Sequence, residues 1–454
     1  RGGDRCDGGV TEKEGAVKDF VIREVSLYGK CMVDAAVSDG KWAAIGEGLG
    51  AGFGEELDGR GKILLPGVVD AHVHFNEPGR ADWEGLETGS RALAAGGGTA
   101  FFDMPLNSSP PVLDGDGVRA KRRLGEEKSR TDFGIWGGLT PDSLGKLGEM
   151  ADEGVVAFKA FMCGSGLEEF GKAGRAVLAK GMKVAAERGL VVGVHAEDER
   201  VIAEHAAKFP RGVAADISEG MRQWCDSRPV EAEIAAIRIA MELAGEAGAK
   251  LHVVHVTHVD CLELIAEGRR KGVDVTAETC PHYLLLDKGM AERIGPNAKC
   301  APPLRSRGAV DRLWNALDLV ETIGSDHSPS PPEMKVGEDV FAMWGGIAGC
   351  QHGMPLVCDQ AIRRVMDLEG LSEKWRGNVF RRFGVKGGGI DVGEDADFFL
   401  LGKDVSEVSR VEQRSRHGLS PYIGMKREWR VCGSWLRGEL IGDETRGRFL
   451  QPLR

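Results

Sequence analysis

The chain has 454 residues, 42% of them hydrophobic, and a formal net charge of −11. This length fits one barrel of ~250 residues together with an accessory domain. The acidic balance argues against a nucleic-acid partner, because a phosphate-binding surface needs a basic face. No apolar run approaches the ~20 residues that cross a bilayer, so membrane insertion is not expected.

The ten cysteines are scattered, and no two of them form a CxxC pair. In a chain of this length, that pattern predicts buried, reduced thiols of an intracellular protein rather than a disulfide framework. Residues 1–17 contain no apolar signal core and do not start with methionine, so we expect a disordered or processed N-terminus there. The sequence therefore does not separate a cytoplasmic location from an endomembrane or peroxisomal lumen.

Residues 18–62 contain short β-like pieces, "FVIREVSLYG" and "KWAAIGEG", separated by turn residues. Segments of the same character return near the other end of the chain, at 395–402 and 427–441. Because both ends differ from the middle of the chain, we expect them to form one small composite β domain. The expected boundaries of this domain are residues 18–66 plus 388–445.

The middle of the chain, residues 67–387, alternates short apolar runs with charge-rich, helix-like segments such as 230–248 and 261–272. Near-continuous apolar strands separated by helices are typical of a parallel sheet that is buried on both faces. Eight such units predict an α/β fold, a (β/α)8 barrel of the TIM type. A doubly wound open sheet is the alternative, which the absence of a GxGxxG motif after the first run weakens. The eight predicted strands lie within 67–75, 99–105, 133–139, 155–161, 190–197, 251–258, 273–279 and 319–327.

Side chains that can bind a metal lie towards the end of five of these eight runs. His72 and His74 are two residues apart, so on a strand they emerge on one face while Val73 points away. The carboxyl ends of barrel strands meet at one opening, where the chemistry of such barrels is found. Imidazole and carboxylate groups suit a divalent metal such as zinc, whereas satisfied core histidines are the plain alternative. The predicted ligands are His72, His74, Lys159, His195, His255 and Asp326.

Lys159 fits this set only as a neutral amine, because an ammonium group repels metal ions. A neutral lysine reacts with carbon dioxide to give a carbamate, which is an anionic bridging ligand. Burial and neighbouring cations both lower the pKa of a lysine and so favour the neutral form. The alternative for Lys159 is an ordinary side chain whose ammonium group extends to solvent.

The remaining histidines have weaker patterns. His252 and His258 are each three residues from His255, an odd spacing that puts them on the opposite face of a strand, so we expect packing or supporting roles. His282 follows the seventh run and could line the mouth of the barrel. His327 follows Asp326 directly and is expected to be structural. Surface or loop positions are expected for His205, His352 and His417.

With these six residues, the chain resembles the cyclic amidohydrolases, whose pattern is an HxH strand, a carbamylated lysine, two further histidines and a late aspartate. The resemblance covers roughly residues 60–440 and implies a small β-sandwich beside the barrel. Within these enzymes the chain is most similar to the allantoinase family. A dihydroorotase would usually have arginine at the position of Asn76, which counts against that relative. The stretches that favour allantoinase are "DMPLNSSP" (103–110), "FGIWGGLTPD" (133–142), "KCAPPLR" (299–305), "SDHSPSPPEMK" (325–335) and "MWGGIAGCQ" (343–351).

The resemblance implies hydrolysis of the hydantoin ring amide of allantoin to allantoate. It further implies two divalent metal ions, zinc foremost with cobalt, manganese or nickel as alternatives, bridged by carbamylated Lys159. Asp326 would then be the catalytic acid and base as well as a ligand. The substrate contacts that the resemblance implies are Asn107, Ser328 and the backbone around Cys300 and Ala301. Simple capping of a loop or helix is the alternative for Asn107 and Ser328.

Two other functions stay open at this point. The first is another cyclic-amide hydrolase, such as a hydantoinase, a dihydropyrimidinase or a dihydroorotase. The second is a non-catalytic scaffold of the same fold, which would be expected to lose ligands, whereas all six are present here. The sequence is compatible with a homo-oligomer and does not determine its size, the metal, or the preferred enantiomer of allantoin.

Overall fold

The computed structural model describes residues 19–50, 52–209, 212 and 214–453. The expectation for residues 1–17 lies outside the described residues. Two sheets of eight strands each organise the rest of the chain: a parallel sheet from its middle and a mainly antiparallel sheet from its two ends.

The parallel sheet is the predicted barrel, and each of the eight predicted runs overlaps one of its strands. Neighbours follow the order of the chain, from β6 to β13. A parallel bridge between Val73 and His327 connects the first strand to the segment that follows the last, which nearly closes the barrel. The strands are β6 (Val68–Val73), β7 (Gly98–Asp103), β8 (Asp132–Gly138), β9 (Ala157–Phe161), β10 (Val191–His195), β11 (Lys250–Val253), β12 (Val275–Thr279) and β13 (Thr322–Ile323).

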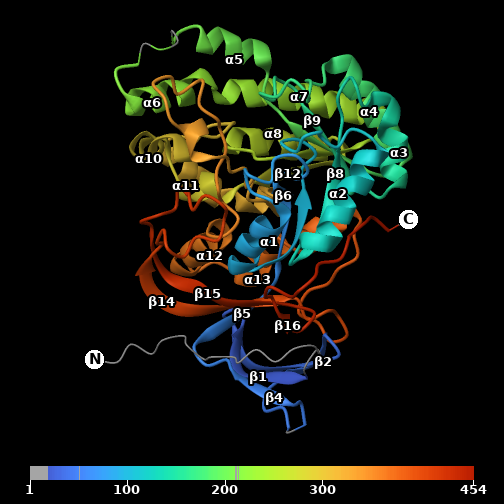
Figure 1. Ribbon diagram of the computed structural model, residues 1–454, viewed down its shortest axis with the longest axis vertical. Coiled ribbons are helices and arrows are strands. Elements are labelled where there is room, and N and C mark those ends of the chain that lie inside the picture. Colours follow the sequence, from blue (N-terminus) through green and yellow to red (C-terminus); the bar gives the residue numbers. More distant parts are fainter. Residues whose placement is uncertain (1–18, 51, 210–211, 213, 454) are drawn as a thin grey trace.

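Most of the connections between these strands contain helices that lie outside the barrel (Figure 1). The longest is α7, whose buried residues recur at a helical spacing and include Ala236, Ile237 and Ala240. The helices are α1 (Leu86–Ala95), α2 (Gly115–Lys128), α3 (Leu147–Asp152), α4 (Arg175–Glu187), α5 (Glu199–Ala206), α6 (Ile217–Ser227), α7 (Val230–Ala247), α8 (Val259–Arg270), α9 (Pro281–Leu285), α10 (Lys288–Ile294), α11 (Arg307–Asn315), α12 (Gly353–Arg363), α13 (Leu368–Glu373) and α14 (Gly377–Phe383), with short 3-10 helices at Leu144–Lys146, Gly295–Ala298, Leu317–Leu319 and Pro332–Lys335.

The second sheet joins the two ends of the chain, as the composition predicted. Strand β14 runs antiparallel to β5, with Leu400 opposite Leu64, so blue and orange-red strands lie side by side in Figure 1. Its core is aromatic: the rings of Phe398 and Trp435 stack with centroids 4.7 Å apart. The strands are β1 (Phe20–Leu27), β2 (Cys31–Ser38), β3 (Lys41–Gly46), β4 (Glu55–Asp58), β5 (Lys62–Pro66), β14 (Phe398–Glu407), β15 (Lys426–Leu436) and β16 (Glu439–Leu440).

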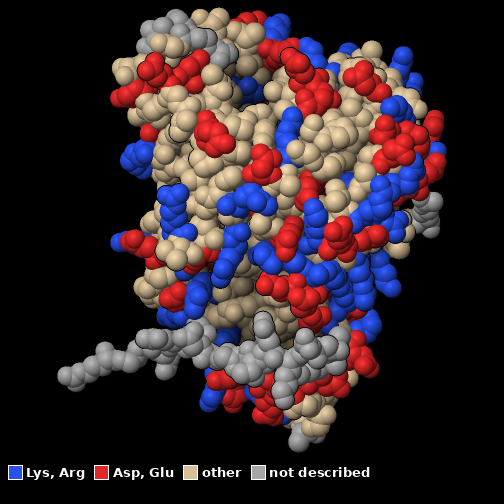
Figure 2. Space-filling model, in the orientation of Figure 1, with Lys and Arg blue, Asp and Glu red and all other residues tan. Residues whose placement is uncertain are grey.

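The surface and the thiols add two observations. Figure 2 shows basic and acidic side chains intermixed over the face that it displays. Nine cysteines lie in the described part of the chain, and seven of them are buried, but Cys31 is exposed and Cys432 half-buried. The prediction of buried thiols was wrong for these two, because both lie on strands of the small sheet rather than in the barrel. Among the described residues, no helix is both long and apolar enough to cross a membrane.

Candidate active site

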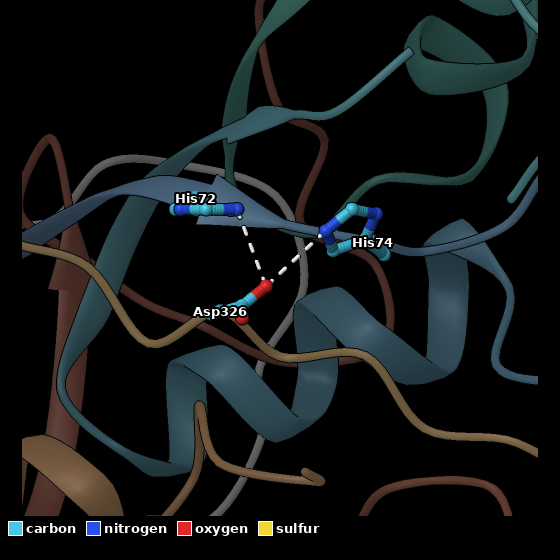
Figure 3. Close-up of side chains that lie close together, drawn as sticks. All are labelled: His72, His74 and Asp326. Atoms are coloured by element: carbon cyan, nitrogen blue, oxygen red, sulfur yellow. Dashed lines mark ion pairs between the residues drawn. The ribbon is translucent and has the colours of Figure 1, made fainter. Parts of the chain in front are cut away.

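Three predicted ligands meet at one point of the barrel opening. His72 is on β6, His74 follows the end of that strand, and Asp326 follows β13. The Oδ1 atom of Asp326 lies 3.2 Å from Nε2 of His72 and 3.2 Å from Nε2 of His74. Figure 3 shows both rings directed at this carboxylate. The i, i+2 spacing at the end of β6 therefore brings both imidazoles to the same carboxylate.

The other three predicted ligands lie around the same point. The Nζ atom of Lys159, on β9, is 3.4 Å from Nε2 of His72. The ring of His255 is 5.5 Å from that of His72 and 4.6 Å from that of His195, measured between centroids. His195 ends β10 and stacks on Phe161 at 4.5 Å.

Two of these residues have a backbone that side chains rarely adopt. The φ angle is 43° at His255 and 46° at Asp326, in the left-handed region. Each residue lies just after a strand, so the chain turns sharply where the side chain must face the opening. Such a conformation costs of the order of 1–3 kcal/mol and persists where the surrounding structure fixes it, as at functional sites.

One cavity of about 380 Å³ brings all ten predicted site residues together. Asn107 and Ser328 also contact each other, since Nδ2 of Asn107 donates to Oγ of Ser328 over 3.1 Å. The carbonyl of Cys300 accepts from the indole N–H of Trp224 over 2.9 Å. The predicted residues in the cavity wall are His72, His74, Asn107, Lys159, His195, His255, Cys300, Ala301, Asp326 and Ser328.

Two glutamates that the sequence reasoning missed support the histidines. Oε1 of Glu278, on β12, lies 2.7 Å from Nδ1 of His72, and Oε2 of Glu197 lies 2.7 Å from Nε2 of His195. Arg228 pairs with Glu197, its Nε lying 3.0 Å from Oε1. A signal was present in the sequence: Glu197 is two residues after His195, and Glu278 is near the end of the seventh run. The cavity walls contain further residues that were missed, chiefly Phe161, Trp224, Arg228, Lys299 and the segment 341–346.

Burial dominates the electrostatics of the site. It lowers the pKa of Lys159 to about 8, against the opposing attraction of Asp326 and Glu278. It also holds the pKa of His72 well below the usual range, with Lys159 adding to the shift. For Asp326, burial alone would raise the pKa, but the hydrogen bond from His74 and the charges of His74 and Lys159 leave it lowered. Neutral imidazoles beside an ionised carboxylate are the protonation states that bind metal.

The remaining histidines are placed largely as expected. His252 is fully buried on β11 and bonds to Thr276 over 2.8 Å, while His258 caps the start of α8. His327 turns away from the cavity and lies 3.3 Å from Glu84. His282 is fully buried on α9 and is not among the residues that line the cavity. His352 lies in the turn before α12, within the surface or loop positions expected for it, but it is only 5% exposed, because Gln413 packs against it.

The donor set fits a divalent metal. One ligand atom each from His72, His74 and Asp326 lies within 4.8 Å of the others, and these residues come from opposite ends of the barrel sequence. Cys163, His195 and Glu197 form a second such group at the carboxyl ends of β9 and β10. Nitrogen and oxygen donors at this spacing match the chemistry of zinc and related ions.

Comparisons with known proteins agree with this geometry. Residues 63–355 match the profile described as the amidohydrolase family. An allantoinase of Rubrobacter xylanophilus is 44% identical over 96% of this chain and 98% of its own length, and one of Deinococcus radiodurans is 43% identical over 96% and 99%. Among solved structures, the L-hydantoinase (dihydropyrimidinase) of Arthrobacter aurescens superposes with a TM-score of 0.88 and 31% identity, covering 96% of this chain and all of that one. The resemblance inferred from six side chains is thereby confirmed: the chain belongs to the amidohydrolase family, as an enzyme of the cyclic amidohydrolase type.

Proposed function

We propose that this protein hydrolyses the hydantoin ring amide of allantoin to allantoate. The observation that carries the proposal is similarity to allantoinases at 38–44% identity over nearly the whole chain. The cavity suits such a substrate, since allantoin is small, neutral and rich in N–H and C=O groups. Asn107 offers both a donor and an acceptor, and Ser328 offers a hydroxyl beside it.

Metal dependence follows from the family, and the ligand set is part of the proposal. His72, His74, His195, His255 and Asp326 would hold two divalent ions, zinc foremost, and Lys159 would bridge them as a carbamate. When bound, such a pair lowers the pKa of water towards ~7 and polarises a carbonyl group. The lowered pKa of Lys159 supports its modification, because only the neutral amine reacts with carbon dioxide.

The residues of the chain then have defined tasks. Asp326 takes the proton of the attacking water while the new C–O bond forms, and it delivers that proton to the ring nitrogen as the C–N bond breaks. This matters because an amide nitrogen is a poor leaving group. General acid–base help of this type is typically worth ~10²–10⁴ in rate. Its lowered pKa keeps Asp326 ionised and ready to accept a proton at neutral pH.

A hydantoinase or dihydropyrimidinase activity is the second candidate. The observation in its favour is the superposition on the L-hydantoinase of Arthrobacter aurescens and, with a TM-score of 0.83, on the dihydropyrimidinase of Brevibacillus agri. These structures are 31% and 27% identical to the chain, well below its similarity to the allantoinases. Turnover of allantoin against hydantoin and dihydrouracil separates the two candidates.

The test is the turnover of the protein expressed with zinc and bicarbonate. We expect kcat/KM for allantoin to exceed that for hydantoin and dihydrouracil, and metal analysis to find up to two ions per chain. Asp326→Asn should lower kcat by ~10²–10⁴. Asp311→Asn, on the surface of α11, is the matched control and should leave kcat unchanged. Preference for hydantoin would support the second candidate, and no metal together with no turnover would support a scaffold.

Two further assignments belong to this proposal. The small domain comprises residues 18–66 and 388–445, and the catalytic barrel comprises residues 67–387; the strands from Phe20 to Pro66 and from Phe398 to Leu440 support these limits. The protein works inside the cell on a small molecule, which the seven buried cysteines, scattered without CxxC pairs, support.

A further inference from the structure

Residues 341–346 form one wall of the cavity, and all six of them line it together with the predicted metal ligands. This segment belongs to the long connection between β13 and α12, which contains only one 3-10 helix. No strand or long helix therefore fixes the distance of this wall from His72 and Asp326. Its position must come from other contacts.

Lys335 supplies the first of these contacts. It ends the 3-10 helix Pro332–Lys335, is 8% exposed and is not among the residues that line the cavity. Its Nζ atom donates to the carbonyls of Gly346 over 2.8 Å, Pro296 over 3.2 Å and Trp344 over 3.4 Å. Among the described residues, no carboxylate pairs with this ammonium group. Backbone carbonyls from the wall and from Pro296 therefore solvate a buried charge, which would be costly to bury without them.

Lys299 holds the other part of the wall. It is 2% exposed, and its Nζ atom donates to the carbonyls of Phe341, over 3.2 Å, and Met343. The same ammonium lies 4.1 Å from the centre of the Trp224 ring. In return, the N–H of Gly346 donates to the carbonyl of Lys299 over 2.7 Å. Two ammonium groups thus bind carbonyls at four of the six positions of the wall.

Gly346 connects the wall to the predicted substrate contacts. Its φ angle is 146°, and a Cβ atom at this position would lie 2.1 Å from the carbonyl oxygen of Ser328. The wall therefore packs directly against Ser328, whose hydroxyl accepts from Asn107. A shift of the wall would change the width of the cavity at the place where Asn107 and Ser328 face it.

We propose that Lys335 is a positioning residue that, with Lys299, clamps the wall 341–346 at the distance that the substrate requires. Lys335 acts through the carbonyls of Trp344 and Gly346 and does not touch the substrate itself. The inference rests on the proposed function, since it takes allantoin as the substrate that the wall encloses. Lys335 lies outside the cavity, but through the wall it contributes to the affinity for the substrate independently of the metal ligands.

The test compares Lys335→Met with Lys374→Met. Methionine keeps the length of the buried chain and removes the donors. Lys374 is the matched control, because its Nζ atom donates to the carbonyl of Val320 over 2.7 Å and it does not line the cavity. For Lys335→Met we expect the KM for allantoin to rise about tenfold, with kcat within about threefold and the zinc content unchanged, since the loss corresponds to about one charge-assisted hydrogen bond. Hydrogen–deuterium exchange of residues 341–346 should become faster in this variant alone.

If Lys335→Met changes neither the KM nor the exchange of residues 341–346, the proposal that Lys335 positions the wall is wrong. It is equally wrong if the variant lowers only the zinc content or only kcat. If Lys335→Met does not fold, exchange in the wild-type protein decides. The amides of Trp344 and Gly346 should then exchange much more slowly than those of the exposed residues Lys386 and Gly387, and equal rates would contradict the proposal. If the wild type does not turn over allantoin, the proposed function fails and the clamp is judged by exchange alone.

Discussion

Glu278 and Glu197 bind opposite nitrogens of two imidazole rings. Glu278 lies at Nδ1 of His72, whereas Glu197 lies at Nε2 of His195. A carboxylate next to one ring nitrogen holds the hydrogen there and leaves the lone pair on the other nitrogen. His72 therefore presents Nε2 to Asp326, and His195 is left with Nδ1 as the nitrogen that could bind a metal. At the scale of single residues, these glutamates set which atom of each histidine is available to a metal.

The first prediction concerns this support. Glu278→Gln keeps the shape of the side chain but replaces the carboxylate that holds His72, so we expect metal affinity to fall about 10–100-fold. Titration of the metal-free protein with zinc against a competing chelator measures the change. Glu187→Gln, at an exposed position at the end of α4, is the control and should leave affinity unaltered. Equal affinities for the two variants would show that Glu278 does not orient His72.

The second prediction concerns the protonation of Lys159 in the metal-free protein. Burial lowers its pKa to about 8 from an ordinary value of 10.5, so its neutral fraction rises about tenfold per pH unit below 8 and levels off above it. At a fixed concentration of dissolved carbon dioxide, the rate of carbamate formation should follow the same curve. Carbon-13 NMR with labelled carbon dioxide measures it. A rate that still rises tenfold between pH 9 and 10 would indicate an unshifted lysine.

The meeting of the six proposed ligands in one cavity could be predicted because each lies towards the end of an apolar run. His195 and His255 are visible in this way from the sequence alone. Lys299 and Lys335 could not be predicted, because their acceptors are backbone carbonyls, which carry no residue identity. The left-handed backbone of Asp326 was equally hidden, since it depends on the packing of the turn and not on a glycine or asparagine signal.

At the scale of elements, a buried ion pair connects α2 to β7 beneath the site. Nζ of Lys121 lies 2.6 Å from Oδ2 of Asp103, and both side chains are 1% exposed. The other oxygen of Asp103 accepts from the N–H of Phe75 over 2.9 Å, directly after His74. One carboxylate at the end of β7 therefore holds both the helix and the end of β6 that presents the two histidines.

The third prediction follows from this pair. Lys121→Met leaves Asp103 as a buried carboxylate without its cation, and breaking a buried pair in this way typically costs ~3–5 kcal/mol of stability. Thermal unfolding at a fixed scan rate should therefore show a clearly lower midpoint for this variant. The double variant Asp103→Asn with Lys121→Met removes both charges and should recover part of the loss. No recovery would mean that the packing of Lys121, and not its charge, is what matters.

The strands were the most predictable elements, and the connection after β13 was the least. Runs such as 190–197 are continuous and apolar because both faces of a barrel strand are buried. Helix α9 has only five residues, from Pro281 to Leu285, too few to show a helical period. The segment 341–346 has neither the period of a helix nor that of a strand, so its sequence does not predict its position. Hydrogen bonds from Lys299 and Lys335 and the close contact at Gly346 hold it in place.

At the scale of the whole molecule, two arginines join the small sheet to the amino ends of barrel strands. Arg437 follows β15, and its Nη1 atom lies 2.7 Å from Oδ2 of Asp132, the first residue of β8. Arg376 lies 3.0 Å from Asp397, just before β14, and also donates to the carbonyl of Gly67 over 2.8 Å. The two arginines therefore attach the sheet to the amino ends of the strands, whereas the proposed ligands lie at the carboxyl ends.

The last prediction uses this separation. Arg437→Met leaves the carboxylate of Asp132 without its cation, and burial already raises the pKa of Asp132 against the pull of Arg437. We expect a loss of about 1.5–3 kcal/mol, the usual range for a hydrogen bond to a charged group. Because Asp132 is at the far end of β8 from the cavity, kcat and KM for allantoin should stay within about twofold of the wild type, unlike those of Asp326→Asn. The thermal midpoint and the kinetics at 25 °C test both halves, with the exposed Arg410→Met as the control. A fall in kcat together with the fall in the thermal midpoint would contradict this expectation. It would show that the small sheet affects the geometry of the barrel opening as well as the stability of the protein.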